Sequence, residues 1–594
     1  MAIKQTKSKA ILNWDTFNVG RDTTVEFQQN STDAVLNRVV GAETKPSQIL
    51  GAIKGDGTVM LVNQNGVIFT GSSQVNVRNL IVAAGAITDN QFANNGIYVN
   101  ASGSQPTLTD ALGVVEVESG AQITTHKPTS STDDGGYVML LGKQVHSAGQ
   151  ITTESGQTVL AAGDYFYIRK GVGTDGNAKS TTSGNEVSVG LKVDSDAGKV
   201  INTGLIAATG GDITMTGHDV TQAGVVVATT STSKRGTIHL SSRASDATGR
   251  VTFEKGSTTA VLLDESGATA LDSQRNAALA GLNDAQVNPL ATGNFDNLST
   301  TADRSELSRI EVVSGNTVEF QGDSMTIATG GEVVVTAVKR TLVDTGAQLD
   351  VSGAIGVRVA METNNLKINV QGNEQRDSPV NREDGSLNSS DVWVDRRSLV
   401  LVPAGTNGYE TDRWYTAGGL LEVSGYLATS GHSVGEWMAQ GGTVTVTGGD
   451  LVTRAGSNIN ISGGTLDVQS GFIGQSWLKG ANGRLYELSH APGDVLYTGL
   501  YQGYEATSER WGHTDNYYSP LIGASKRYEP GYTVGRDAGK LVVATSNAVL
   551  EGAITGEVYQ GDRQISAAQP GLDGYYQSQY AVARRGQLII GQYL

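Results

Sequence analysis

One short phrase recurs along this 594-residue chain: two small residues, usually Gly-Gly, and then alternating polar and apolar residues. It begins at residues 135, 155, 210, 235, 330, 441 and 463. Neighbouring copies lie 20, 25 and 22 residues apart, as between residues 136 and 156, 211 and 236, and 442 and 464. Such alternation, bounded by Gly, Ser, Asn and Asp, predicts short β-strands joined by tight turns. Self-similarity at this period is typical of a solenoid.

Two or three short strands per repeat, with hardly any helical pattern, predict an all-β parallel β-helix. Successive coils would pair, apolar side chains would stack inside, and glycines would occupy corners that need positive φ or cannot hold a Cβ. Roughly twenty coils at about 4.8 Å each would give a rod on the order of 100 Å long. The alternative is a string of antiparallel β-sandwiches. The nearly constant spacing of the phrase favours the β-helix.

The composition excludes several other classes of protein. The chain has no cysteine, which excludes a disulfide framework, a thiolate zinc site and a cysteine nucleophile. No apolar run is long enough to span a bilayer as a helix. The formal net charge is −16 and no Lys/Arg cluster is present, so nucleic acid is not an expected partner. The polar start (MAIKQTKSKA) lacks the apolar core of a signal peptide, so the protein is either cytosolic or already processed.

Three stretches break the repeat and are predicted to be loops or small subdomains inserted at corners of the rod. Residues 264–309 have a short helical pattern, and residues 371–416 are charged and Asn-rich. Residues 475–535 are unusually aromatic, with 10 of the 35 aromatic residues of the chain. Strand character returns at residues 539–543, and the chain stops just after the strand pattern of residues 586–590. We expect the native protein to continue, because an uncapped coil edge would pair with other chains.

The N-terminal part contains a specific order of motifs. Residues 11–20 (ILNWDTFNVG), 35–41, 47–51 and 57–69 (GTVMLVNQNGVIF) are followed by residues 73–82. This order resembles the haemagglutination-activity (two-partner secretion) domain of the filamentous haemagglutinin family, the large exoproteins of Gram-negative bacteria. The resemblance implies a right-handed β-helix. We expect a two-partner secretion domain over residues 1–170 and continuing β-helix repeats, with the three insertions, over residues 171–594.

The resemblance also implies an export route. The N-terminal domain would be recognised by the periplasmic domains of an Omp85-type outer-membrane transporter, and the chain would thread outward unfolded and fold at the cell surface. The Asn-Pro-Asn-Gly-Ile turn of the family corresponds to Asn63, Gln64, Asn65, Gly66 and Val67. Gln64 replaces proline, which loses rigidity but keeps the Asn-Gly step. These residues are the candidate transporter-recognition motif, or they only shape a turn.

The absence of cysteine fits this route, because a disulfide formed in the oxidising periplasm would fold the chain back and block threading. We expect a cysteine pair at Val138 and Val159, on successive repeats, to bridge the two coils and stall secretion under oxidising conditions.

The resulting prediction is a secreted or cell-surface filamentous adhesin without enzymatic activity, cofactor or metal. Its rod would act as a stalk or as an adhesive surface for cells, matrix or polysaccharide, as in a biofilm. Exposed Tyr and Trp side chains stack on sugar rings and bind proteins. The candidate ligand-binding residues are Trp477, Tyr501, Tyr504, Trp511, Tyr517 and Tyr518. Alternatively, these rings form the core of the insertion itself.

Two other functions remain open. The chain could be the stalk of a contact-dependent inhibition toxin, or a carbohydrate-active β-helix enzyme with a groove of three or more acidic residues. Residues 431–435 (GHSVG) match a hydrolase elbow, but no helix pattern follows them. Residues 171–176 (GVGTDG) read as a loop, and residues 193–198 as an ordinary turn. The seven histidines lack metal-ligand spacing, and His146 and His239 are expected on strands that face solvent.

Overall fold

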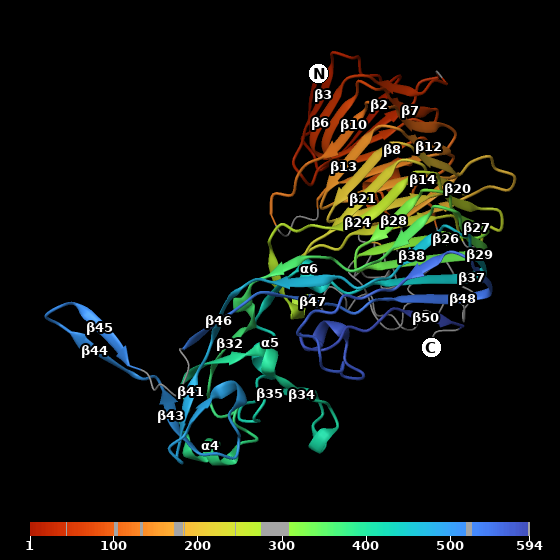
Figure 1. Cartoon of the computed structure of the whole chain (residues 1–594). Helices are drawn as coiled ribbons and strands as arrows, with labels where there is room; N and C mark the ends of the chain where they lie inside the picture. The colour runs from red at the N-terminus through yellow and green to blue at the C-terminus, as the bar shows by residue number, and fades with distance from the viewer. Residues whose placement is uncertain are drawn as a thin grey trace.

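The computed structural model describes residues 1–42, 44–99, 105–130, 135–170, 182, 184–243, 245–274, 308–517 and 525–591. Its largest element is a 32-stranded sheet wound into a rod, in which successive coils pair in parallel. Figure 1 shows the coils following one another from the N-terminus at one end of the rod to β48 and β50 at the other. The predicted right-handed parallel β-helix with insertions is confirmed, and the alternative of antiparallel sandwiches is wrong.

The strands of the rod stack into three columns, each forming one face. The first face contains β1 (Ala2–Lys4), β3 (Thr24–Gln28), the first halves of β6 (Ala52–Val62) and β8 (Gln74–Ala83), β10 (Gln122–Thr125), β13 (Gln150–Glu154), β18 (Leu205–Thr209), β21 (Val225–Thr230), β24 (Thr258–Leu263), β28 (Met325–Ala328), β30 (Gln348–Asp350), β38 (Asn458–Asn460) and β49 (Ala553–Thr555). The second face contains β2 (Lys9–Trp14), β4 (Ala34–Val39), the second halves of β6 and β8, β11 (Tyr137–Gly142), β14 (Gln157–Ala162), β19 (Asp212–Thr216), β22 (Thr237–Ser241), β26 (Arg309–Ser314), the first halves of β29 (Glu332–Val343), β37 (Thr443–Thr453) and β48 (Lys540–Leu550), and β50 (Gln587–Ile590). The third face contains β5 (Ser47–Ile49), β7 (Gly66–Phe69), β9 (Val114–Val117), β12 (Gln144–Ser147), β17 (Lys199–Asn202), β20 (Asp219–Gln222), β23 (Arg250–Phe253), β27 (Thr317–Phe320) and the second halves of β29, β37 and β48.

The rod is shorter than the sequence predicts. Its first face is a stack of thirteen described strands, from β1 to β49, where roughly twenty coils were expected. At about 4.8 Å per strand, thirteen coils extend about 60 Å. The difference arises because the chain leaves the rod twice for long excursions, between β30 and β37 and between β38 and β48.

Close stacking of successive coils explains the Gly-Gly phrase. A Cβ built on Gly156 would lie 1.7 Å from the carbonyl oxygen of Gly136, and one on Gly211 would lie 1.8 Å from that of Gly156. Gly442 and Gly539 continue the pattern, since a Cβ on Gly539 would lie 1.7 Å from the Gly442 oxygen. Backbone occupies the place of the side chain at each of these corners, so any residue larger than glycine would push the coils apart.

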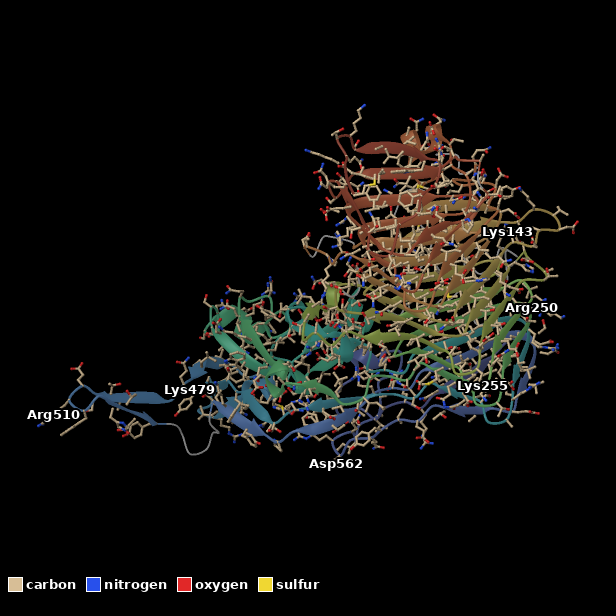
Figure 2. All side chains as sticks on the ribbon, turned by 90° about the horizontal axis from the view of Figure 1, so that it is seen from above. Lys143, Arg250, Lys255, Lys479, Arg510 and Asp562 are labelled. Carbon is tan, nitrogen blue, oxygen red and sulfur yellow. The ribbon has the colours of Figure 1, made fainter. Side chains whose placement is uncertain are left out.

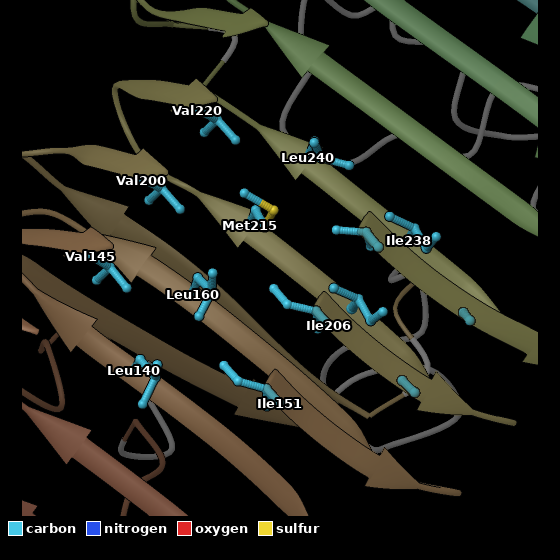
Figure 3. Close-up of a cluster of buried hydrophobic side chains, with 14 of the residues drawn as sticks. Leu140, Val145, Ile151, Leu160, Val200, Ile206, Met215, Val220, Ile238 and Leu240 are labelled. Carbon is cyan, nitrogen blue, oxygen red and sulfur yellow. The ribbon is translucent and has the colours of Figure 1, made fainter. Parts of the chain in front are cut away.

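Inward-facing side chains form one continuous apolar core along the rod. In the second face, Leu140 pairs with Leu160, Leu160 with Met215, and Met215 with Leu240, and all four are fully buried. Figure 3 shows these residues stacked on successive strands, with side chains of the other faces beside them. Parallel in-register pairing therefore places like residues on top of one another, which accounts for the recurring apolar pattern.

The outer side of the second face is also covered near the N-terminus. The helix α1 (Asp89–Asn95) and the antiparallel hairpin of β15 (Tyr165–Lys170) and β16 (Asn185–Gly190) contribute to a second apolar cluster there. Val159 belongs to this outer cluster, whereas Val138 belongs to the rod core. The register pairs Val138 with Thr158 and Met139 with Val159. The expected bridge between Val138 and Val159 is therefore wrong, because their side chains lie on opposite sides of the sheet.

The two long excursions build a single projecting subdomain, which extends to the left of the rod in Figure 1. They share a buried cluster in which Leu366 and Val394 of the first excursion pack with Leu478 and Tyr497 of the second. The first excursion contains β31 (Val357–Val359), η1 (Met361–Asn364), β32 (Asn365–Asn369), α4 (Pro379–Asp384), β33 (Asp391–Asp395), η2 (Arg396–Ser398), β34 (Val400–Val402), η3 (Thr406–Gly408), β35 (Arg413–Tyr415), α5 (Ser424–Leu427), β36 (Gly431–Ser433) and α6 (Val434–Trp437). The second contains β39 (Thr465–Val468), β40 (Gly471–Gly474), β41 (Trp477–Gly480), β42 (Leu485–Glu487), η4 (Leu488–His490), β43 (Tyr497–Tyr501), β44 (Tyr504–Ser508), β45 (His513–Tyr517), β46 (Lys526–Glu529) and β47 (Tyr532–Gly535).

The expected insertions at residues 371–416 and 475–535 lie within these two excursions. Of the insertion expected at residues 264–309, the strand β25 (Thr269–Leu271) is described and pairs with β36, while residues 275–307 lie outside the described part. A further turn near the C-terminus, η5 (Gly574–Tyr576), packs close to this junction, where Tyr575 donates a hydrogen bond to Asp272 at 2.7 Å.

Candidate functional site

Residues 63–67 comprise the turn between β6 and β7 and the first two residues of β7, and Asn63 organises the turn. The Asn63 side chain is 2% exposed. Its Nδ2 donates to the Lys45 carbonyl and to Ser47 Oγ, each at 3.1 Å, and its Oδ1 accepts from the backbone N–H of Asn65 at 3.0 Å. Because an asparagine that bonds the backbone two residues ahead mimics a backbone turn, Asn63 sets the local chain direction.

Of the other four residues of this motif, some are buried and fix the backbone, and one is exposed. Gly66 has a φ of +110°, and a Cβ there would lie 2.4 Å from the carbonyl oxygen of Val114 on the next coil. Val67 is fully buried in the rod core. Gln64, at the place of the family proline, is the exposed residue of the five, and Asn65 is half-buried. Asn63, Gly66 and Val67 thus shape the turn, and Gln64 offers the surface that a partner could contact.

The six candidate aromatic residues occupy two places in the projecting subdomain. Trp477 and Tyr501 are register partners on β41 and β43 and are half-buried. Tyr504 and Tyr517 pair at the base of the hairpin formed by β44 and β45. Tyr518 lies outside the described residues.

Trp511 lies at the tip of this hairpin and is 75% exposed. Its backbone N–H donates to the Ser508 carbonyl at 3.1 Å, and the Arg510 guanidinium lies 5.2 Å from its ring centroid, within cation–π range. In Figure 1 the hairpin extends farthest from the rod, and Figure 2 labels Arg510 at its end. The hairpin therefore presents an aromatic ring and a positive charge at the far end of the subdomain.

Other aromatic residues of the same segment do form a core. Tyr497 is fully buried, and its ring meets that of Tyr486 edge to face at 5.5 Å. Tyr532 packs against a neighbouring apolar cluster. The aromatic-rich segment thus contains both packing rings and surface rings, and sequence composition alone could not separate them.

A cluster of ionisable side chains lies buried on the outer side of the second face. His239 belongs to it and is 9% exposed, so its expected exposure to solvent is wrong. Its Nδ1 lies 2.9 Å from Asp212 Oδ1, and its Nε2 lies 3.5 Å from Glu311 Oε2. Arg309 contacts Glu311 at 3.1 Å and Glu332 at 2.6 Å. Strand alternation predicts correctly that His239 points away from the rod core, but this part of the outer side is buried as well.

The cluster has the wrong environment for catalysis on polysaccharides. Asp212, Glu311 and Glu332 are the three neighbouring carboxylates that a carbohydrate-active groove would need, yet all three are buried. They are balanced by cations, which include Arg235, whose pKa burial and the neighbouring Arg309 lower to about 10. A paired, buried cluster stabilises the strands that carry it and leaves no open acidic groove at this place.

The cluster predicts a pH dependence of stability. Burial works against the imidazolium of His239, but Asp212 and Glu311 outweigh it and raise the pKa of His239 from 6.5 to about 9. The raised pKa means that the stabilising contribution is complete below pH 6.5 and is lost as the pH rises through 9. We expect the free energy of unfolding to fall by about 3 kcal/mol over this window, measured by urea unfolding.

The test variant is His239→Gln, which should remove the fall in the free energy of unfolding above neutral pH. The matched control is His146→Gln. His146 lies on β12, and burial lowers its pKa, the opposite direction to His239, so its variant should still lose stability as the pH rises toward 9. If His239→Gln shows the same pH dependence of the free energy of unfolding as the wild type, His239 is not its cause.

The serine of the hydrolase-like motif acts as a helix cap. The helix α6 does follow it, contrary to expectation, and Ser433 Oγ accepts the backbone N–H of Glu436 at 3.2 Å while Glu436 Oε2 accepts that of Ser433 at 2.8 Å. The preceding β36 pairs antiparallel with β25, whereas a nucleophile elbow needs a parallel sheet. Residues 171–176 lie outside the described part of the chain.

Within the ranges that the structure describes, no group of three or more His, Cys, Asp or Glu side chains is arranged to hold a metal ion. None of the helices described is both long enough and apolar enough to cross a membrane.

Comparison with known proteins places the N-terminal part in one family. A family model described as the TPS secretion domain matches residues 1–257. A heme/hemopexin-binding protein of Haemophilus influenzae is 29% identical over 225 residues, which are 38% of this chain and 22% of that protein. A second heme/hemopexin-binding protein of Haemophilus influenzae is 42% identical over 82 residues, 14% of this chain and 9% of that protein. The chain therefore spans less than a quarter of the length of these relatives.

Among solved structures, the HMW1 secretion domain of Haemophilus influenzae aligns over 77% of this chain and 90% of that chain, with 15% identity and a TM-score of 0.42. The resemblance of residues 11–82 to the two-partner secretion domain of filamentous haemagglutinin-type exoproteins is confirmed by the family match.

Proposed function

We propose that this chain, whose residues 1–257 form a two-partner secretion domain of the filamentous haemagglutinin type, is an adhesin that a partner transporter exports through the outer membrane of a Gram-negative bacterium. The secretion domain is the single observation that carries this proposal. The rod then serves as a stalk at the cell surface, and the subdomain built by its last coils is the part that meets a target. We propose residues 1–170, within this match, as the two-partner secretion domain itself, and residues 171–594 as continuing β-helix repeats with insertions.

The partner in export is an Omp85-type transporter that engages the secretion domain through its periplasmic domains. The turn at residues 63–67 supports this proposal, because Gln64 is exposed while Asn63 and Gly66 hold its backbone in a fixed shape. The absence of cysteine supports passage of an unfolded chain.

The hairpin of β44 and β45 is the proposed adhesive element. Trp511 and Tyr517 are 75% and 45% exposed, and large exposed rings lose little entropy when they bind a sugar ring or a protein. The target is a polysaccharide or a receptor on a host or bacterial surface, and contact with matrix polysaccharide would support a biofilm. The two other functions, toxin stalk and carbohydrate-active enzyme, have no supporting observation among the described residues.

The double variant Trp511→Ala and Tyr517→Ala tests this element. We expect adhesion of cells that display the protein to fall at least tenfold, about 1.4 kcal/mol, with an unchanged melting temperature. The measurement is attachment of displaying cells to polysaccharide-coated and cell-coated surfaces, together with a thermal melt of the purified chain. Tyr528→Ala is the matched control, because Tyr528 is 59% exposed on the same subdomain but lies on β46. A lowered melting temperature with normal adhesion would instead assign these rings to packing.

A further inference from the structure

A cavity of about 370 Å³ lies where the projecting subdomain meets the last coils of the rod. Its walls come from segments far apart in the sequence, including Asp272 after β25, Arg396 in η2, His432 in β36 and Tyr576 in η5. The volume falls in the range of about 300–1,000 Å³ that small-molecule sites occupy. The cavity is separate from the hairpin tip and from the turn at residues 63–67, so what it binds goes beyond the adhesive contact proposed above.

The acidic groups of the cavity are already engaged by the protein. Asp272 Oδ1 accepts hydrogen bonds from Trp437 Nε1 at 3.1 Å and from the Tyr575 hydroxyl at 2.7 Å. Glu436 closes the cap of α6 and lies 3.1 Å from His432 Nδ1. The hydrogen bonds that these carboxylates accept come from protein groups, so these acceptor positions are already occupied, although both carboxylates keep their negative charge.

Two neighbouring arginines in this wall have different roles. Arg397 forms a two-point contact with Asp395, Nε to Oδ1 at 2.9 Å and Nη2 to Oδ2 at 2.6 Å, and is nearly fully buried. Arg396 is half-buried, and within the described part of the chain no carboxylate pairs with it. Arg397 therefore holds the fold together, while Arg396 brings to the cavity a guanidinium that no carboxylate of the described residues pairs with.

Among the described residues, Arg396 contacts an imidazole. Its Nη1 lies 3.3 Å from His432 Nε2. Because Glu436 faces His432 Nδ1, the proton of the neutral ring belongs on Nδ1 and Nε2 accepts from the guanidinium. Asp272 Oδ2 lies 4.0 Å from the same His432 Nε2 and makes no ion pair with Arg396, whose planar fork of N–H groups suits a carboxylate.

The remaining wall suits a sugar ring. Trp414 and Tyr576 supply aromatic surface, and Asn364, Gln577 and Ser578 supply amide and hydroxyl groups. Aromatic faces stack against the C–H face of a sugar, and amides and hydroxyls exchange hydrogen bonds with its hydroxyl groups. We propose that this cavity binds a carboxylate-bearing sugar, a uronic acid, with Arg396 holding its carboxylate.

The test compares D-glucuronate with D-glucose, which carries a hydroxymethyl group in place of the carboxylate, on the purified full chain. We expect saturable binding of glucuronate in ligand-observed NMR titrations and at least tenfold weaker binding of glucose. The Arg396→Gln variant should bind glucuronate at least tenfold more weakly than the wild type, and the melting temperature of the protein should not change. Arg250→Gln, exposed on β23 of the rod and outside the lining of the cavity, is the matched control and should bind as the wild type.

Equal binding of the two sugars, absence of saturable glucuronate binding, or unchanged affinity in Arg396→Gln would each overturn the proposal. An oligosaccharide that ends in the same uronic acid distinguishes the two sources of this chemistry. Tighter binding of the oligosaccharide than of the monomer identifies a polysaccharide chain end, and equal binding identifies the free sugar acid. Because the readout is binding to the purified chain, the Trp511 and Tyr517 variants should leave it unchanged even if they abolish adhesion.

Discussion

Replacing Gly211 with alanine is expected to destabilise the rod by at least about 4 kcal/mol, an exceptional loss for the addition of one methyl group. The new Cβ would lie 1.8 Å from the carbonyl oxygen of Gly156 on the preceding coil. That oxygen cannot simply move away, because it accepts the backbone N–H of Asp212 at 3.1 Å. Relieving the clash therefore costs a ladder hydrogen bond and separates two coils whose side chains are closely packed.

Urea unfolding of the purified chain measures this loss, and Gly425→Ala is the matched control. Gly425 lies in the short helix α5, where a Cβ would meet no atom within 4 Å. Its variant should unfold within about 0.5 kcal/mol of the wild type, as surface substitutions usually do. A Gly211→Ala rod as stable as the control would mean that the coils are not stacked as closely as the structure has them.

The fold could be predicted because its physical cause repeats. Many coils have a glycine where they cross the carbonyl of their neighbour, as at Gly156 and Gly211, and the coils have apolar residues at alternate positions of their strands. Both features recur along the rod, so they are visible in one sequence without knowledge of the contacts. The number of coils was not predictable in this way, since long excursions have strand patterns of their own.

What could not be predicted depends on contacts between distant segments. The insertions at residues 371–416 and 475–535 share a core in which Leu366 packs with Tyr497, and no local pattern links these two residues. The burial of the outer side of a strand could not be predicted either. Alternation places His239 and Val159 there, but whether that side meets water depends on segments that cover it.

The candidate sites also differ in how far the sequence alone could identify them. The turn at residues 63–67 could be identified because its motif is contiguous, and the structure adds that Asn63 is buried within it. The aromatic segment was visible from composition, but the separation of exposed Trp511 from buried Tyr497 needed the structure. The cavity beside Arg396 had no sequence signal, because segments that are widely separated in the sequence, from Asp272 to Gln579, form it.

A disulfide between cysteines placed at Gln122 and Gln150 is expected to abolish export under oxidising conditions. These residues are register partners on β10 and β13, and both are exposed on the first face of the rod. Neighbouring parallel strands lie about 4.8 Å apart, within the Cα separation of about 4.4–6.8 Å that disulfides need. The bridge closes a loop in the chain, so a pore that admits one extended strand would have to pass two.

The same bridge should stabilise the folded rod, which separates a threading defect from misfolding. Closing a loop of this size restricts the unfolded chain and is worth about 3 to 4 kcal/mol in the loop-entropy account. The oxidised double variant, purified and refolded, should therefore unfold at higher urea concentration than its reduced form. Surface display of the double variant should be lost without reductant, when the bridge is formed, and restored when added reductant opens the bridge.

The single variants Gln122→Cys and Gln150→Cys are the controls, since each carries a thiol that has no partner cysteine in this chain. Both should reach the surface at the wild-type level with or without reductant. If the oxidised double variant is exported as efficiently as they are, the chain does not cross the outer membrane as a single unfolded strand, and folding of the coils would have to begin before the transporter is reached. Loss of export in a single variant would instead place the defect in the substitution itself, and the neighbouring register pair Thr124 and Thr152 would then carry the bridge.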